Sequence, residues 1–256
     1  MSEPNFIKTE TANGVVRITL DRPKHNVLNI EMMRELIAEL EKVTTDPELK
    51  CVVIFGEGRS WCAGVEVGDH KPELVDDMIS TFDRIFELVD ALEIPIIAAV
   101  QGACLGGGME VAIACDIIVA ANSAIFGQPE IKVGFFPPFA AVRLPQLVGP
   151  AKAVEICTTG KRYSAQQAKE LGFVSHCVDD DGLSAAVEEL IGEITYNSPL
   201  IIRLNKRAVK QHLNVPFPKS LMGASDMFLN TLMKTEDTLE GIRSFEEKRK
   251  PEWKNK

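Results

Sequence analysis

Three consecutive glycines, Gly106 to Gly108, stand between an apolar run and an apolar helical segment, with Glu110 in the first turn of that helix. Glycine lets a ligand approach the backbone closely, and the first N–H groups of a helix are unpaired donors that point outward. A carbonyl oxygen placed there would be stabilised as its negative charge grows. The same glycines also suit close packing, with Glu110 merely favoured by the helix dipole, so both interpretations stay open.

Glu130 is the second candidate for acid–base chemistry. It follows Pro129 and is flanked by apolar residues such as Phe126 and Ile131. A carboxyl group in apolar surroundings either finds a partner or has its pKa raised, which suits general acid–base catalysis. The plainer interpretation places Glu130 on the surface of a loop. In one cleft, Glu110 and Glu130 would share a water, one accepting its proton and the other donating a proton to substrate.

The remaining candidates are weaker. The four histidines are scattered without metal-ligand spacing, so we expect no metal site. No G-x-G-x-x-G or P-loop lysine accompanies the glycines, and no G-x-S-x-G motif indicates a serine nucleophile. Cys62 and Cys104 are interpreted as small packing residues. Three aromatic rings, those of Phe135, Phe136 and Phe139, belong either to the core or to a flat apolar pocket.

The elements that position these residues alternate between strands and helices. Residues 15–20 alternate apolar and polar side chains, as a half-buried strand does. Residues 51–55, 96–100 and 117–120 are continuous apolar runs, typical of strands covered on both faces. Apolar residues at helical spacing predict helices over residues 30–43 and 76–92.

The pattern becomes helical from about residue 150. Ser164 and Gln167 form a capping box, and Gly172 stands where that short helix should end. Ser198 and Pro199 open another helix, and residues 220–250 are expected to be helical. Strand–helix alternation followed by helices predicts an α/β body with a helical C-terminal region.

Composition restricts the class of protein. A chain of 256 residues with 45% hydrophobic and 25% charged residues is typical of a globular protein. The net charge of −9 argues against nucleic-acid or anionic-membrane partners. The apolar run at residues 94–100 is far short of the ~20 residues that a membrane span needs. No secretory signal is predicted, and six cysteines without a C-x-x-C pair indicate a reduced, cytoplasmic protein.

Six segments in order make the chain resemble the enoyl-CoA hydratase/isomerase (crotonase) superfamily over almost its whole length. They are DRPKHNVLN, GEGRSWCAG, IPIIAAVQGACLGGGMEVAIACDIIVAA, AIFGQPEIKVG, TTGKRYSAQQAKELGFVS and TEDTLEGIRSFEEKRKP. The resemblance implies a spiral of ββα units over residues 1–195, with a C-terminal helical trimerisation region over residues 196–256. It also implies an acyl-CoA thioester substrate, no separate cofactor, and assembly as a homotrimer or a dimer of trimers.

The same resemblance assigns roles to individual residues. The oxyanion-hole amides fall on Val65 and Gly107, and the two catalytic glutamates of the hydratase branch fall on Glu110 and Glu130. Glutamate at both positions favours addition or elimination of water. The residues expected to line the acyl-CoA site are Lys24, Ala63, Glu66, Val67, Gly68, Phe135, Phe136 and Phe139.

One segment departs from the usual hydratase pattern. Typical hydratases follow the second glutamate with a run of small residues resembling I-P-G-A-G-G-T-Q-R-L, whereas residues 136–144 are bulkier and one residue shorter. This run, together with DHKPE at residues 69–73 and the EKRKPEWKNK ending, is similar to the cyclohexa-1,5-diene-1-carbonyl-CoA hydratases of anaerobic benzoyl-CoA degradation. The phenylalanines would then face a flat ring.

The resemblance therefore predicts addition of water to a cyclic dienoyl-CoA. Glu110 would activate water and Glu130 would deliver the proton, although a coupled pair can titrate as one unit and the division of roles stays open. Two alternatives remain: a general enoyl-CoA hydratase or isomerase acting on linear chains, and a non-catalytic member that binds RNA or acts as a scaffold. The negative net charge weakens the RNA-binding alternative, and the two glutamates weaken any non-catalytic one.

Overall fold

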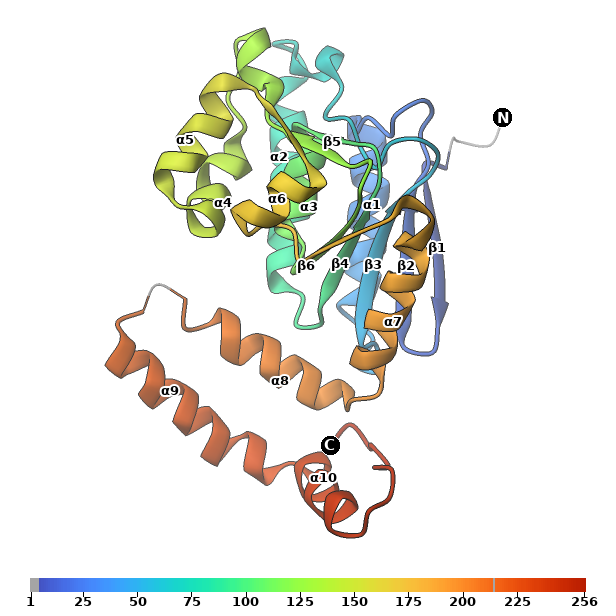
Figure 1. The fold of residues 1–256 in the computed structure, drawn as a ribbon, viewed down its shortest axis with the longest axis vertical. Coiled ribbons are helices and arrows are strands. Elements are labelled where there is room, and N and C mark those ends of the chain that lie inside the picture. Colours follow the sequence, from blue (N-terminus) through green and yellow to red (C-terminus); the bar gives the residue numbers. More distant parts are fainter. Residues whose placement is uncertain (1–4, 214) are drawn as a thin grey trace.

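A six-stranded sheet with the strand order β1-β2-β3-β4-β6-β9 forms the centre of the computed structural model, which describes residues 5–213 and 215–256 (Figure 1). β1 and β2 pair antiparallel, and all other neighbours pair parallel. Parallel neighbours need crossover connections, so helices intervene between most of these strands in the chain. The strand bounds are Ile7–Ala12 (β1), Val15–Leu20 (β2), Cys51–Gly56 (β3), Ile96–Val100 (β4), Ile117–Ala121 (β6) and His176–Val178 (β9).

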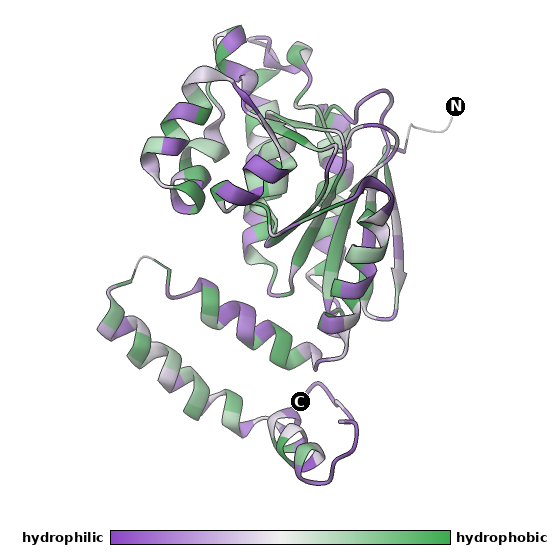
Figure 2. Cartoon of the chain, in the orientation of Figure 1, coloured by the Kyte–Doolittle hydropathy of each residue, from purple (hydrophilic) through white to green (hydrophobic). Residues whose placement is uncertain are grey.

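Side chains of these strands alternate between two apolar layers, as the pleat requires. Val53, Ile97 and Val119 face α7 (Leu183–Thr195), which covers one side of the sheet through Val187 and Ile191. The alternate residues face the larger core on the other side, against α1 (Ile30–Val43), α2 (Val75–Ala91) and α3 (Gly107–Ala114). In Figure 2 the central strands are accordingly apolar along their length.

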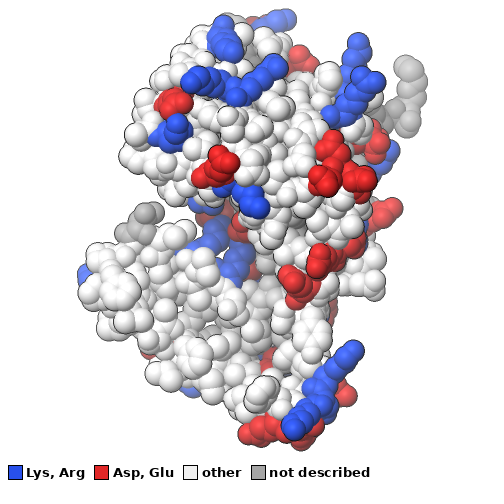
Figure 3. All heavy atoms as spheres, viewed as in Figure 1, with Lys and Arg blue, Asp and Glu red and all other residues white. Residues whose placement is uncertain are grey.

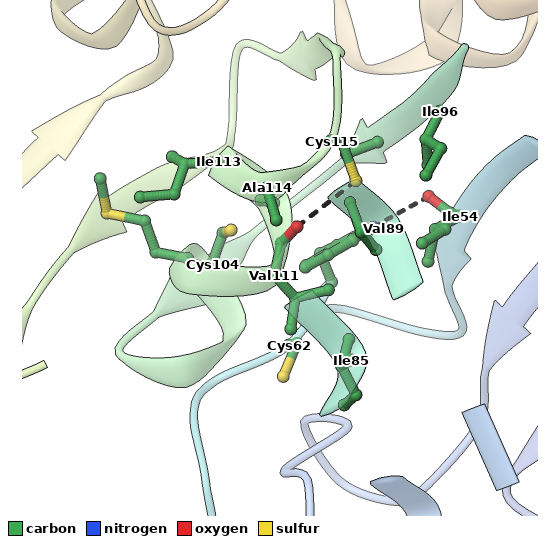
Figure 4. Packing of buried hydrophobic residues seen from close by; sticks show 14 of the residues in the cluster. Ile54, Cys62, Ile85, Val89, Ile96, Cys104, Val111, Ile113, Ala114 and Cys115 are labelled. Carbon is green, nitrogen blue, oxygen red and sulfur yellow. Dashed lines mark hydrogen bonds between the residues drawn. The ribbon is translucent and has the colours of Figure 1, made fainter. Parts of the chain in front are cut away.

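Helix α3 lies inside this larger core. Every residue from Gly107 to Ala114 is buried, which explains why the helix is apolar on all sides. Figure 4 shows Val111, Ile113 and Ala114 of α3 among Ile85 and Val89 of α2 and residues of β3 and β4. Glu110 is therefore carried by an element that offers it little contact with water.

A second, three-stranded sheet carries the other candidate carboxylate. It consists of β5 (Ala103–Leu105), β7 (Ile125–Gly127) and β8 (Arg162–Ser164), with β7 in the middle. β7 leads into the short 3-10 helix η2 (Pro129–Val133), which holds Glu130. The helices that follow are α4 (Pro138–Val148), α5 (Pro150–Thr159) and α6 (Ala165–Leu171), and two further 3-10 helices are η1 (Val67–His70) and η3 (Asp180–Gly182).

The C-terminal helices form an arm that extends from the body (Figure 1). It comprises α8 (Pro199–Lys210), α9 (Phe217–Asn230), the 3-10 helix η4 (Leu232–Lys234) and α10 (Glu236–Glu246). The single helical stretch expected over residues 220–250 is wrong in this respect. α9 ends at Asn230, and a new helix begins at Thr235, whose side chain caps α10 by accepting from the Thr238 amide.

The other predicted elements are confirmed, including the capping box at Ser164 and Gln167 and the helix end at Gly172. The interpretation overlooked β1, the three-residue strands β5, β7, β8 and β9, and helix α4. A strand of three residues is too short to show an apolar period, and β1 exposes every side chain except Ile7. Within residues 5–213 and 215–256, no helix is long and apolar enough to cross a membrane.

Candidate active site

Val65 and Gly107 lie against each other at the start of α3. Val65 pairs with Leu28 in an isolated parallel bridge, in which the Leu28 amide donates to Gly64 and the Glu66 amide donates to Leu28, both at 2.8 Å. A Cβ atom on Gly107 would lie 2.5 Å from Val65 Cγ2 and 3.5 Å from the Val65 nitrogen. Only glycine permits this approach, which brings the two backbone amides to one place.

Both amides are available to a ligand. The bridge to Leu28 uses the residues on either side of Val65, so the Val65 N–H points the other way. The Gly107 N–H belongs to the first turn of α3, where helical partners are missing. Within residues 5–213 and 215–256, no carbonyl oxygen accepts from either amide. The pair has the chemistry of an oxyanion hole.

Glu110 lies one turn into α3 and is only 2% exposed. Its Oε1 accepts a hydrogen bond from the Ala140 amide at 2.8 Å, at the start of α4. Burial raises the pKa of Glu110 to about 8, and the Glu130 and Asp83 carboxylates add to the increase. The hydrogen bond from the Ala140 amide and the nearby Phe139 amide oppose the increase by favouring the ionised form. A carboxyl group with this pKa exchanges protons near neutral pH.

Glu130 lies on η2 beside the first glycine of the cluster. Burial raises its pKa to about 7. A Cβ atom on Gly106 would lie 2.6 Å from Glu130 Oε1, so this glycine leaves the space that the carboxylate occupies. The fully buried Gln128, with its amide nitrogen turned toward these acceptors, lies 3.1 Å from both carboxylate oxygens and 3.3 Å from the Gly106 carbonyl oxygen. The carboxylate is thus held between a glycine backbone and an amide donor.

The structure therefore brings together the four residues assigned to catalysis: two free amides, and two carboxylates close enough to interact electrostatically. The interpretation of Glu130 as an exposed loop residue is wrong, since Glu130 lies on η2 and is half-buried. Such an arrangement can stabilise an enolate oxygen while one carboxylate accepts a proton and the other donates one.

The predicted binding residues of the N-terminal half form one rim of the site. The Ala63 amide donates to the His25 carbonyl at 2.9 Å, which ties the exposed Lys24 loop to the oxyanion segment. Glu66 forms an ion pair with Arg22 at 3.2 Å, so its carboxylate joins the two loops. Val67 is 64% exposed and, with Gly68, belongs to η1. These loops are positioned to meet a ligand that extends outward from Val65.

The three phenylalanines do not share one pocket. Phe135 stacks on His70 of η1 with ring centroids 4.8 Å apart. Phe136 is 72% exposed. Phe139 stacks on Phe86 of α2, with centroids 3.8 Å apart and planes 8° apart. Only Phe139 lies directly beside Glu110, through its peptide N–H.

Sequence reasoning missed several residues of the site. Gln128 was part of the Gln-Pro-Glu motif, and its position two residues before Glu130 was the available signal. No local signal marked Ala140, Phe82 or Phe86, which come from other elements. Cys62 and Cys104 are fully buried, which supports their interpretation as packing residues. No cluster of three or more metal-ligating side chains occurs in the part of the chain that the structure describes.

Comparison with known proteins identifies the class. The enoyl-CoA hydratase/isomerase family model matches residues 10–256. The chain belongs to this family, and its fold is the crotonase fold. An enoyl-CoA hydratase structure from Bacillus anthracis superimposes with a TM-score of 0.93 and 33% identity, covering 98% of this chain and 100% of that one.

Two relatives are similar to this chain over nearly its full length. The short-chain-enoyl-CoA hydratase of Clostridium acetobutylicum is 32% identical, with 98% of each chain covered. The 2,3-dehydroadipyl-CoA hydratase of Escherichia coli is 34% identical, with 94% of this chain and 96% of the relative covered.

Proposed function

We propose that the protein adds water to the conjugated double bond of an α,β-unsaturated acyl-CoA thioester. The observation that carries this proposal is a buried carboxyl group, that of Glu110, and a half-buried one, that of Glu130, with pKa values raised to about 8 and about 7, beside two free amides. Addition of water needs a base and an acid on one substrate, and both groups exchange protons near neutral pH.

The thioester carbonyl oxygen accepts hydrogen bonds from the Val65 and Gly107 amides. The reactive pair of carboxyl groups holds one proton, which the two groups share as a coupled pair. In the form that carries this proton on Glu130, Glu110 takes a proton from water as the water oxygen attacks the β-carbon, and the electron pair of the double bond moves toward the carbonyl to give an enolate. The amides stabilise this negative charge. Glu130 then donates its proton to carbon, and the proton taken from water restores the acid–base pair. The amide of Gln128 keeps the Glu130 carboxylate in place.

For the acyl group we propose the ring of cyclohexa-1,5-diene-1-carbonyl-CoA, an intermediate of anaerobic benzoyl-CoA degradation. Attack at the β-carbon and protonation at the far end of the diene amount to a 1,4-addition, and the product is 6-hydroxycyclohex-1-ene-1-carbonyl-CoA. The run after Glu130 supports this choice, because Phe139 and Phe86 form a flat aromatic wall next to Glu110. The run, the 69–73 segment and the C-terminal ending resemble that subgroup.

A linear enoyl-CoA is the second candidate, because relatives named for crotonyl-CoA and short-chain enoyl-CoA cover almost the whole chain. A parallel assay with the cyclic dienoyl-CoA and crotonyl-CoA, with added water detected by mass spectrometry, separates the two. Turnover of the ring thioester alone supports the cyclic substrate. Turnover of crotonyl-CoA alone overturns it, and turnover of neither overturns hydration itself. Glu110→Gln serves as the catalytic control.

We also propose that residues 196–256 assemble the chain into a homotrimer or a dimer of trimers. α9 has no buried residue, and its exposed apolar side chains include Phe217, Met222 and Leu229, at 75%, 69% and 62% exposure. A second copy would cover them. Light scattering after size exclusion tests this: the double variant Phe217→Asp/Met222→Asp should lower the mass, and a monomeric wild type would contradict the proposal.

The reaction as written uses no separate cofactor, since CoA is part of the substrate. A cytoplasmic location is proposed from the cysteine content, because the six thiols suit a reducing compartment.

A further inference from the structure

A cavity of about 480 Å³ lies between the body and α8 of the arm. Figure 3 shows basic side chains in the hollow between these two parts. The apolar part of its lining comes from α2, α3, α4 and the segment after α8, and includes Phe86, Val89, Ala114, Phe139, Val142 and Leu213. The catalytic scheme above makes no use of this space.

The cavity begins immediately behind the active site. Ala114 lines it and follows Glu110 by four residues on α3, so the two side chains lie on one face of the helix, about 5–6 Å apart at their Cβ atoms. Phe139 also lines the cavity, and its peptide N–H lies close enough to the Glu110 carboxylate to lower the pKa of that group. Phe139 thus borders both the active site and the cavity.

A row of three aromatic rings separates the two spaces. Phe82 Cζ lies 3.1 Å from the position of a Cβ on the oxyanion glycine Gly107. Phe82 contacts Phe86 edge to face at a centroid distance of 4.7 Å, and Phe86 stacks on Phe139 at 3.8 Å. The row therefore runs from the oxyanion hole to the cavity, and its last two rings form the cavity wall.

The basic side chains that α8 contributes at the outer edge of the cavity are paired. Three basic side chains of α8 are paired with acidic residues of the body: Lys206 with Asp116 at 2.6 Å, Lys210 with Asp90 at 2.8 Å, and Arg207 with Glu93. Arg143 of α4 also lines the cavity, and its guanidinium donates to the Ile113 carbonyl at 3.2 Å and to the Gln146 side chain at 3.0 Å. With the charged groups engaged in this way, the apolar side chains are the surface that a hydrocarbon tail would contact.

We infer that the stacked rings of Phe86 and Phe139 are the wall that limits the acyl group, and that the cavity behind them would receive a longer hydrocarbon chain if Phe139 were small. The inference rests on the proposed function, because it takes an acyl-CoA as the ligand. It assigns the specificity for compact acyl groups to Phe139. Van der Waals contact excludes a chain of more than a few carbons while the ring is present.

The test compares acyl-CoA thioesters of four and eight carbons on the wild type, Phe139→Ala and Phe139→Leu. Calorimetric titration with butyryl-CoA and octanoyl-CoA measures binding without turnover, and kcat/KM is measured with the matching 2-enoyl thioesters. In Phe139→Ala, preference for eight over four carbons should rise about ten-fold or more, with a smaller rise in Phe139→Leu. Phe173→Leu removes another buried stacked ring, from the contact with Phe126 outside the cavity, and should leave the preference unchanged.

An unchanged preference in folded Phe139→Ala and Phe139→Leu would overturn the inference, as would an equal rise in Phe173→Leu. Thermal unfolding identifies a variant that fails to fold, in which case Phe139→Leu decides. If the wild type hydrates no enoyl thioester, the proposed function fails, and the saturated thioesters still decide whether Phe139 limits the acyl group.

Discussion

A Cβ atom on Gly106 would lie 2.6 Å from Oε1 of Glu130, closer than real Cβ atoms approach any oxygen. The first glycine of the cluster therefore holds space for the second carboxylate, while the next glycine supplies an oxyanion amide. This contact joins the two halves of the site. The Glu130 carboxylate thus lies beside Gly106, the residue that directly precedes the oxyanion glycine Gly107.

Gly106→Ala should reduce hydratase activity more than stability. The atom that the new methyl group meets is the end of a flexible side chain, so Glu130 turns away while the fold persists. Misplacement by about 1 Å can cost about 10²-fold in rate, and we expect a fall in kcat/KM of this order. Gly58→Ala is the matched control: Gly58 also has a positive φ, +77° against +52°, but nothing lies within 4 Å of its Cβ position.

Both alanine variants place a side chain on a backbone of positive φ, and at Gly106 (φ 52°, ψ −132°) the conformation is one that glycine alone adopts readily. Denaturant titration measures the loss of unfolding free energy in each variant, so that activity is compared between folded proteins. Equal activity losses in Gly106→Ala and Gly58→Ala would contradict a role for Gly106 in placing Glu130.

Replacing either glutamate by glutamine should lower kcat by about 10²–10⁴-fold, because each loses one proton transfer. Glu110→Gln keeps an oxygen to accept from the Ala140 amide, so its fold should be retained. The double variant should be little worse than the more damaged single variant, since the carboxylates act as one unit. If the fold-loss of kcat in the double variant equals the product of the two single fold-losses, the two carboxyl groups act in separate steps.

The pH dependence of kcat/KM should be bell-shaped. Catalysis needs one carboxylate and one carboxylic acid, and burial raises the pKa of Glu130 to about 7 and that of Glu110 to about 8. Below about pH 7 both groups become protonated and the base is lost. Above about pH 8 both become ionised and the acid is lost. The two apparent pKa values of this profile describe the coupled pair of carboxyl groups and not one glutamate each. A rate that stays flat from pH 5 to pH 9 would contradict this assignment.

The local pattern of apolar residues was sufficient to predict β2, β3, β4, β6, α1 and α2, because each has a clear period or a continuous run. It was insufficient for β1, whose side chains are mostly exposed, and for the break between α9 and α10. There the apolar spacing continues, and the capping by Thr235 decides where the new helix begins.

The residue types of the site could be read from the sequence, but the sequence did not show that these residues lie close together in the fold. Glu110 and Glu130 are joined through the second sheet, in which β5 and β7 pair side by side just before each carboxylate. The environment of the phenylalanines was also hidden. The partner of Phe139 is Phe86 and that of Phe135 is His70, both more than 50 residues away in the chain. No periodicity can reveal contacts of that kind.

Glu110→Gln should stabilise the protein, and more at pH 8 than at pH 5. Burial raises the pKa of Glu110 from its ordinary value of 4.5 to about 8, so the folded state binds this proton more tightly than the unfolded chain does. Its contribution to stability is complete below about pH 4.5 and is lost as the pH rises toward 8. Glutamine has no proton to lose, so the advantage of the variant should grow by a few kcal/mol over this range.

Denaturant titration of both proteins at pH 5, 6.5 and 8 measures that difference in unfolding free energy. Other ionisable groups contribute equally to the two proteins and cancel. Glu189→Gln, at an exposed position of α7, controls for the loss of one negative charge and should show a constant difference from the wild type. If the difference in unfolding free energy between Glu110→Gln and the wild type does not change with pH, Glu110 ionises as freely in the folded protein as in the unfolded chain. In that case the buried carboxyl group could not serve as an acid or base near neutral pH.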